Sequence, residues 1–201
     1  MASPHRKPST RQLILDASMA RLIAHGYPSF TLDAVGEDVG ITRQAVLYHF
    51  SSKERLLSEI AIDVVTAESA ALCKAVSRAR NAPDAIKRFV LALVDHYVAE
   101  PAKLRVAYFL PQFASLRLEP DYHDRLHGAT GAAYTALEDA IRADPETPSG
   151  VHPRRLAVSV HLAAVGHVTM HCLTEAVGDP MLHGVRPLAL ELVQTLTRAW
   201  R

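Results

Sequence analysis

Apolar residues recur at spacings of three and four along nearly the whole chain, and this periodicity constrains the fold more than any other feature. Runs of β-branched residues in strict alternation with polar ones, which would indicate half-buried strands, are absent from the sequence. Proline and glycine interrupt the apolar pattern and divide it into segments of helical length. The sequence therefore predicts an all-α protein of about nine helices.

Three short helices are expected within the first fifty residues. The first lies between Ser9 and Gly26, the second begins at Thr31, and the third begins at Thr42 after a turn that contains Gly40.

A long fourth helix is expected to begin at Ser51, because Ser51 and Glu54 have the S-x-x-E spacing of a capping box. Five further helices are predicted over 83–99, 102–117, 121–143, 153–177 and 187–200.

Basic residues are concentrated at the N-terminal end. The first 55 residues hold seven Lys and Arg against five acids, whereas the rest hold fifteen against sixteen. A basic end on a neutral body suits a protein whose N-terminal part alone meets a polyanion. Cys73 and Cys172 have no C-x-x-C spacing, and no apolar run approaches the ~18 residues of a membrane span. We therefore expect a cytoplasmic protein with reduced thiols, no membrane partner and no signal peptide.

Residues 31–50, TLDAVGEDVGITRQAVLYHF, have the helix-turn-helix pattern of two short helices joined by a turn with glycine. The apolar residues expected to lock these helices together are Ala34, Val35, Val39, Ile41, Val46 and Phe50. The outward face of the third helix would then carry Thr42, Arg43, Gln44, Ala45, Tyr48 and His49. The same spacing also occurs by chance in all-α enzymes.

This outward face has the chemistry of a duplex reader. Arginine binds guanine and glutamine binds adenine at two points each, and an alanine methyl contacts a thymine methyl. Thr42 and the N–H groups at the helix start are suited to a phosphate. Three more side chains are expected near phosphates that flank the groove, namely Tyr48, His49 and Lys53.

The segment ILDASMARLIAHGYPSFTLDAVGEDVGITRQAVLYHFSSKERLL resembles the DNA-binding domain of the tetracycline-repressor (TetR) family of transcriptional regulators. The similar features are the small-residue first helix, the G-Y turn, the G-I-T turn and the Y-H-F-S-S-K-E-x-L-L junction to a long helix. The resemblance implies a flexible basic arm over 1–8, a helix-turn-helix domain over 9–55, and a larger helical domain over 56–201 for ligand binding and dimerisation.

The resemblance also implies roles for single residues. The family's usual phosphate-contacting positions hold Thr42, Tyr48, His49 and Lys53, its base-facing positions hold Arg43, Gln44 and Ala45, and Thr31 matches a contact at the start of helix two. Many members have Gly or Pro followed by a small residue where this chain has Gln44-Ala45, so the operator sequence is not predicted. The implied protein is a repressor, without enzymatic activity or cofactor, that binds a palindromic operator as a homodimer and is released by a small effector.

The two C-terminal helices are the candidates for dimerisation. Residues at spacings of three and four form a seam in each helix. The predicted interface consists of Leu156, Val160, Ala163, His167 and Met170 with Leu188, Leu192 and Leu196. An internal core seam would have the same pattern.

Aromatic residues gather in the middle helices, where apolar walls with a few polar anchors suit a medium-sized, largely apolar effector. The predicted ligand-binding residues are His96, Tyr97, Tyr108, Phe109, Phe113, Tyr134 and His171. Any one of them is equally well explained as a core residue.

Two histidine pairs have the i,i+4 spacing that can bring two imidazoles to one metal, and they are His123 with His127 and His167 with His171. Asp121 and Asp124 lie beside the first pair, but no HExxH glutamate or nearby cysteine completes either set. We expect no metal site. The rival interpretation is an all-α metal-dependent enzyme or metal sensor that uses residues 121–127, and a third is a family member that binds a protein in place of DNA.

Overall fold

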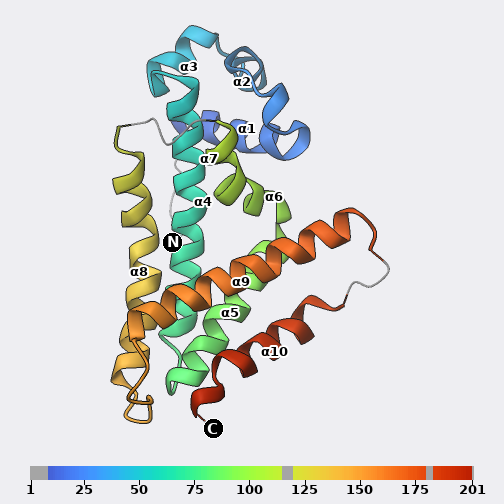
Figure 1. Ribbon diagram of the computed structural model, residues 1–201. Helices are drawn as coiled ribbons and strands as arrows, with labels where there is room; N and C mark the ends of the chain where they lie inside the picture. Colours follow the sequence, from blue (N-terminus) through green and yellow to red (C-terminus); the bar gives the residue numbers. More distant parts are fainter. Residues whose placement is uncertain (1–8, 115–119, 180–182, 201) are drawn as a thin grey trace, which may run out of the picture. The chain divides into compact units, whose positions relative to one another are not determined.

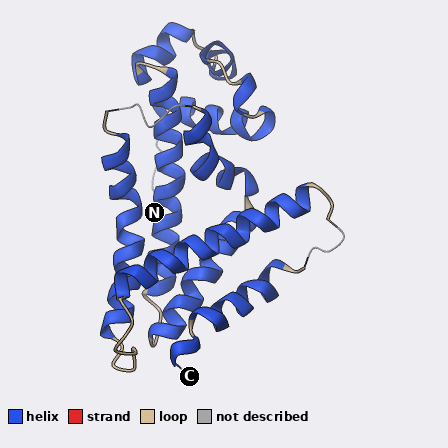
Figure 2. Cartoon of the chain, viewed as in Figure 1, coloured by secondary structure: helices blue, strands red, loops and turns tan. Residues whose placement is uncertain are grey.

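The structure is a computed structural model that describes residues 9–114, 120–179 and 183–200. Every regular element within these ranges is a helix (Figure 2), which confirms the predicted all-α class. The predicted arm over 1–8 lies outside the described residues.

The elements follow one another as Figure 1 labels them. They are α1 (Thr10–His25), η1 (Tyr27–Ser29), α2 (Leu32–Val39), α3 (Arg43–Phe50), α4 (Lys53–Val76), α5 (Ala82–Ala99), α6 (Pro101–Leu104), η2 (Arg105–Phe109), α7 (Leu110–Phe113), α8 (Tyr122–Ala143), α9 (Pro153–Ala176), α10 (Val185–Leu196) and η4 (Arg198–Trp200).

The chain forms two compact units. The first comprises residues 1–64 and 105–123, and the second comprises 65–104 and 124–201. The predicted domain boundary after residue 55 lies inside the first unit. Helix α4 contributes residues to both units, and so does α8.

In the first unit, α1 packs on α2 and α2 packs on α3. Ile14, Val35 and Val46, one from each of these helices, are fully buried, and Phe50 at the end of α3 is 2% exposed. Burial of these apolar side chains supplies the main stabilisation of the three-helix head, which comprises α1, α2 and α3. Of the other residues predicted to lock the head, Ala34, Val39 and Ile41 are only partly buried.

Side-chain caps define where these helices start. The hydroxyl of Thr31 accepts a hydrogen bond from Ala34 N, and that of Thr42 accepts one from Ala45 N, both at 3.2 Å. Both starts were predicted from the sequence.

The predicted start of α4 is wrong by one residue. The Oγ atom of Ser52 accepts from Arg55 N at 2.9 Å, so Ser52 caps the helix. Ser51 instead ends α3 with φ at 58°, in the left-handed region, and its own hydroxyl donates to the Phe50 carbonyl. The S-x-x-E pattern missed this because two serines adjoin and either one can start a helix.

The turn between α2 and α3 depends on Gly36. Its carbonyl accepts a hydrogen bond from Ile41 N at 2.9 Å, which brings α2 directly against the backbone of the turn. A Cβ atom at Gly36 would lie 2.7 Å from the carbonyl oxygen of Ile41. Gly40, in contrast, has open space around it and is needed for its φ of 75°.

In the second unit, α5 packs against both α9 and α10 (Figure 1). Phe89, Val90 and Leu93 of α5 are fully buried. The face of α9 that meets this core carries small and β-branched residues, among them Ala157 and Ala164, which permit close approach of the two helices.

Within the described residues, α9 alone has the length and composition to cross a membrane, with a mean hydropathy of 1.5 over its most apolar window. Only 28% of that window is buried in the protein.

The helix predicted over 102–117 is interrupted. It consists of α6, the π-helical turn η2 and α7, with Pro111 in the first turn of α7. Proline cannot donate an N–H to the preceding turn, which accounts for the break at that point. Residues 115–117 of the predicted helix lie outside the described residues.

We expect Gly36→Ala to destabilise the protein by about 1–3 kcal/mol, because the new methyl group overlaps a backbone oxygen that a rotamer change cannot move. Urea unfolding of the variant and the parent measures this difference. Gly131→Ala is the matched control: it lies in α8 with no atom within 4 Å of the new Cβ, and should instead gain about 0.5–1 kcal/mol. Equal midpoints for Gly36→Ala and the parent would contradict the predicted overlap.

Candidate nucleic-acid interface

The outer face of α3 is open to solvent. Thr42, Arg43 and Gln44 are exposed at its start, and Tyr48 is 86% exposed one turn further on. The backs of these same turns hold Val46 and Phe50 in the core. Helix α3 therefore presents one polar face and is anchored by the other.

The predicted DNA-binding residues are not equally accessible. Ala45 and His49 are half-buried, and the His49 ring meets the edge of the Tyr48 ring at 5.4 Å between centroids. Thr31 is exposed at the start of α2, where it lies at the N-terminus of a second helix. Helix N-termini attract anions, so Thr31 and Thr42 each place a hydroxyl at a site suited to a phosphate.

Lys53 has a different environment from the one expected of a phosphate clamp. Its Nζ atom donates to the carbonyl of Phe30 at 2.6 Å and lies 4.8 Å from the centroid of the Tyr27 ring. The ammonium group thus ties the start of α4 to the segment between α1 and α2 through a charge-assisted hydrogen bond and a cation–π contact. A phosphate contact by Lys53 stays a prediction, and it would have to share this group.

The position of α2 on α1 is held by an ion pair that the sequence did not indicate. Arg21 donates from Nε and Nη2 to the two carboxylate oxygens of Asp38 at 2.8 and 2.7 Å, and Nη2 also donates to the Ala34 carbonyl. The hydrogen bond from Arg21 is the main reason that the pKa of Asp38 lies below its usual range. Two parallel hydrogen bonds fix direction as well as distance, which keeps α2 at one angle to α1.

Comparisons with known proteins support the prediction of a DNA-binding head. Residues 14–60, from α1 to the first turns of α4, match the family of bacterial regulatory proteins called the tetR family. The uncharacterized HTH-type transcriptional regulator TtgW of Pseudomonas putida is 41% identical over 51 residues. Residues 14–60 are therefore a DNA-binding head of the TetR family. That alignment covers 25% of this chain and 38% of the length of TtgW, so it speaks for the N-terminal part alone.

Solved structures extend the similarity in fold to nearly the whole chain. A protein of unknown function from Rhodococcus sp. RHA1 has a TM-score of 0.77 at 19% identity, over 98% of both chains. A regulatory protein of the tetR family from Rhodococcus RHA1 has a TM-score of 0.72 at 18% identity, over 96% of this chain and 97% of that chain. The all-helical C-terminal part therefore has the fold found beside TetR heads. Regulators of the TetR family are non-enzymatic transcription factors.

The residues predicted for the dimer interface do not share one face. Val160 is fully buried in the core of its own protomer, which corrects its assignment to an interface. Leu156, Ala163 and His167 are half-buried, and His167 Nε2 lies 2.9 Å from the Val185 carbonyl. Met170 is 56% exposed as predicted for an interface residue.

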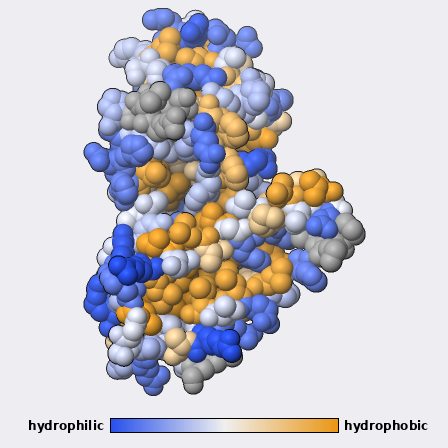
Figure 3. Space-filling model, in the orientation of Figure 1, coloured by the Kyte–Doolittle hydropathy of each residue, from blue (hydrophilic) through white to orange (hydrophobic). Residues whose placement is uncertain are grey.

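A different stripe of α9 faces outward. Its large apolar members are Leu162, Met170, Leu173 and Val177, which adjoins the end of the helix, and they are between 54% and 71% exposed. On α10, Leu188 and Leu190 are also exposed, whereas Leu192 and Leu196 are half-buried. Figure 3 shows hydrophobic side chains gathered on the visible face of α9 and α10, as well as at the far end of α9.

The predicted ligand-binding residues separate into two groups. Tyr108, Phe109 and Phe113 belong to the first unit, and Phe113 is 65% exposed on α7. The members in the second unit are His96, Tyr97, Tyr134 and His171. The predicted seven are therefore divided between the two compact units.

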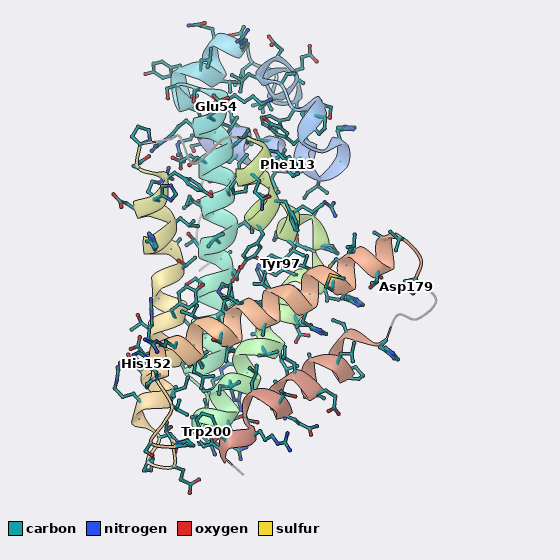
Figure 4. All side chains as sticks on the ribbon, viewed as in Figure 1. Glu54, Tyr97, Phe113, His152, Asp179 and Trp200 are labelled. Atoms are coloured by element: carbon teal, nitrogen blue, oxygen red, sulfur yellow. The ribbon has the colours of Figure 1, made fainter. Side chains whose placement is uncertain are left out.

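A polar chain runs through the second unit around Tyr97, which Figure 4 shows beside α4. The Tyr97 hydroxyl donates to Glu68 of α4, whose other oxygen lies 3.0 Å from His161 Nε2 of α9. His161 Nδ1 in turn meets the hydroxyl of Tyr134 on α8. Four helices, α4, α5, α8 and α9, therefore each contribute one side chain to this hydrogen-bonded network. Glu68 is 2% exposed and His161 is 6% exposed.

The electrostatic environment of this polar chain is that of a desolvated site. Burial raises the pKa of Tyr134, with a further contribution from the Glu68 carboxylate, so its hydroxyl keeps its proton. Burial likewise lowers the pKa of the neighbouring His96, against the opposing effect of Glu68. His96 Nε2 is buried and has no hydrogen-bond partner among the described residues. A buried ring nitrogen without a partner marks a position where a ligand group or water is expected.

Glu68 and His161 are the functional candidates that the sequence analysis missed. Each stands on an apolar stripe of its helix: Glu68 falls between Val64 and Leu72, and His161 between Ala157 and Ala164, all of them buried. A single charged residue on such a stripe was the available signal, because charge is rarely buried without a partner.

No group of three or more His, Cys, Asp or Glu side chains within the described ranges is placed to hold a metal ion. His123 and His127 are exposed, and the Asp121 carboxylate binds Arg55 at 2.6 Å. The metal-based alternative for residues 121–127 therefore gains no support from the geometry.

We expect Lys53→Ala to lower the thermal midpoint of the free protein, since it removes both the hydrogen bond to Phe30 and the contact with the Tyr27 ring. The loss should be about 1–3 kcal/mol in urea unfolding. Arg43→Ala, which also removes one cation from the head but from an exposed site, serves as the control and should stay within about 0.5 kcal/mol of the parent. A parental midpoint for Lys53→Ala would leave its side chain with no structural role and favour the phosphate contact.

Proposed function

We propose that this chain is a ligand-responsive transcriptional repressor that binds a palindromic DNA operator as a homodimer. The observation that carries the proposal is the exposed face of α3, with Thr42, Arg43, Gln44 and Tyr48 outward on a TetR-type head. In this proposal Arg43 and Gln44 read base edges, and Ala45 contacts a thymine methyl. Such a regulator acts on the chromosome, so we place it in the cytoplasm.

Phosphate contacts would set the register of α3 in the major groove. We assign them to the hydroxyls at the starts of α2 and α3, to Tyr48 and to His49, because the first three are exposed and His49 adjoins the Tyr48 ring. Lys53 is a weaker candidate, since its ammonium already has two partners in the free protein.

We expect selection from a random duplex pool to enrich a palindrome with half-sites about one helical turn, ~34–36 Å, apart. Arg43→Ala and Gln44→Ala should each cost about 1–3 kcal/mol of discrimination at one position of each half-site. Thr42→Val should weaken all sequences alike, because it removes a phosphate contact. Recovery of no enriched sequence, or full discrimination in both base-reading variants, would contradict the DNA-binding proposal.

The homodimer is supported by the outward stripe of α9. Leu162, Met170, Leu173 and Val177 form an apolar surface that the protomer itself leaves uncovered. Gly166 lies on the same face, exposed and without any atom near its Cβ position, so it allows another helix to approach closely. A second copy with the same stripe is self-complementary about a two-fold axis. We propose that α9, with Leu188 and Leu190 of α10, forms this interface in place of the seam predicted from sequence.

We expect Leu162→Glu to convert the protein from a dimer to a monomer of 22.0 kDa in light scattering, because it buries a charge at the proposed interface. The same variant should lose affinity for a full palindrome much more than for a half-site. Val98→Glu is the control, since Val98 is also exposed, at 37%, but belongs to α5 and not to the stripe of α9. A Leu162→Glu dimer as stable as the parent would exclude this face.

We further propose that the effector binds in the second unit, near Glu68, Tyr97, Tyr134, His161 and His96. The unpartnered Nε2 of His96 and the buried carboxylate of Glu68 support a ligand that is mostly apolar and carries a hydrogen-bonding end. Effector and operator would each weaken the binding of the other by the same factor.

A further inference from the structure

Four charged side chains of the first unit form a continuous series of ion pairs. Asp121, just before α8, accepts from Arg55 Nη1 of α4 at 2.6 Å. Arg55 Nε lies 3.3 Å from Glu59 Oε1, one turn further along α4. The other oxygen of Glu59 accepts from Arg11 Nη2 of α1 at 2.8 Å. Signs alternate along the series, so each member is held between, or next to, opposite charges.

The series ends on the recognition helix. The guanidinium carbon of Arg11 lies 4.9 Å from the centroid of the Phe50 ring, a cation–π contact. Phe50 is the last residue of α3 and is 2% exposed. The start of α1 is therefore attached to the end of the helix whose outer face is proposed to read DNA.

The distances show how the charges are shared. Arg55 lies closer to Asp121, at 2.6 Å, than to Glu59, at 3.3 Å, and Glu59 lies closer to Arg11, at 2.8 Å. The carboxylate of Glu59 thus lies between two guanidinium groups and contacts each through a different oxygen. Removal of the Asp121 charge takes away an attraction on Arg55, which alters the charge balance at Glu59 and, through it, at Arg11 beside Phe50.

We propose that Asp121 is a positioning residue for DNA binding, which acts through Arg55, Glu59 and Arg11 on Phe50 and thereby on the angle of α3. This inference rests on the proposed function of α3. It assigns a role to the segment that leads into α8, because that segment supplies the charge on which the series depends. An effector or partner that drew Asp121 away from Arg55 would loosen α3 without touching it.

The sign of the effect separates this role from simple electrostatics. Asp121 is an acid, so its neutralisation makes the protein more positive and, by long-range attraction alone, strengthens binding to a polyanion. Loss of the positioning role weakens binding instead. The two mechanisms therefore predict opposite changes for the same substitution.

The experiment measures the affinity of the full-length chain for the duplex enriched in the pool selection. Asp121→Asn should weaken binding by about two- to thirtyfold, the range found for mutations that act on a site without contacting its ligand. The control is Asp139→Asn, which removes the same charge from an exposed ion pair with Arg142 in the second unit and should leave affinity unchanged or slightly higher. Asp121→Glu, which keeps the charge, should restore most of the affinity.

A double-mutant cycle tests the path. In an Arg55→Gln background, Asp121→Asn should have no further effect on affinity, because the series is already interrupted. Asp121→Asn should also speed amide hydrogen exchange at the start of α1 and the end of α3 in the free protein, with the second unit unchanged. The ratio of the affinity of the parent to that of Asp121→Asn should shrink as the salt concentration rises, since partly exposed ion pairs are screened.

If Asp121→Asn binds the duplex as tightly as the parent or more tightly, the inference is overturned. It is also overturned if Asp139→Asn loses as much affinity as Asp121→Asn, or if Asp121→Asn causes the same loss of affinity in the Arg55→Gln background. If the parent enriches no duplex, the proposed function fails on its own. Amide hydrogen exchange of Asp121→Asn still tests the positioning role in that case. Exchange in α3 that is unchanged from the parent would reject the role, and faster exchange would support it.

Discussion

The head depends on one backbone contact, the hydrogen bond from Ile41 N to the Gly36 carbonyl across the turn between α2 and α3. A Cβ atom at Gly36 would overlap the carbonyl oxygen of Ile41, so α2 meets the turn at a separation that glycine permits. This approach aligns Val35 and Val46 for burial and turns the opposite side of α3 outward. The polar face of α3 is open to a partner because its other face is fully used in the core. The Arg21–Asp38 pair then holds α2 on α1, so the helix on which α3 packs is itself fixed in place.

Much of the head was predictable from sequence because its signals are local. Thr31 and Thr42 cap helices at the predicted residues, and Gly40 takes the left-handed conformation expected of a helix end. The wrong start of α4 has an equally local cause, because two adjacent serines gave two possible starts. The phosphate contact of Lys53 stays a prediction, but the hydrogen bond from Lys53 to the Phe30 carbonyl could not be read from the sequence. A contact between residues 23 positions apart leaves no periodic trace in a sequence.

The C-terminal part was predictable in its helices but not in their orientation. Helix α9 is apolar on nearly every side, so spacing by three and four can be drawn through several stripes, and the stripe chosen from sequence included the buried Val160. The outward stripe through Leu162 and Leu173 has the same spacing and becomes distinguishable only when α5 covers the other side. The aromatic residues predicted for the pocket differ in burial, since Tyr97 is fully buried and Phe113 is 65% exposed, so aromatic content alone does not locate a site. The buried charge of Glu68 beside His161 is the more specific feature.

Helix α4 takes part in both arrangements that we consider functional. Its first turns supply Arg55 and Glu59 to the ion pairs that reach Phe50, and its later turns supply Glu68 to the buried polar chain. A regulator needs an element whose state both ligands influence, because an effector alters operator affinity only by binding one state of such an element more tightly. Partly exposed ion pairs are individually weak and exchange partners at little cost, while a buried carboxylate among tyrosines and a histidine resists any change in its contacts. A shift of α4 imposed at Glu68 would therefore be opposed strongly at its source and accommodated easily at Arg55 and Glu59. That asymmetry favours α4 as the shared element, with the sensing end rigid and the responding end adjustable.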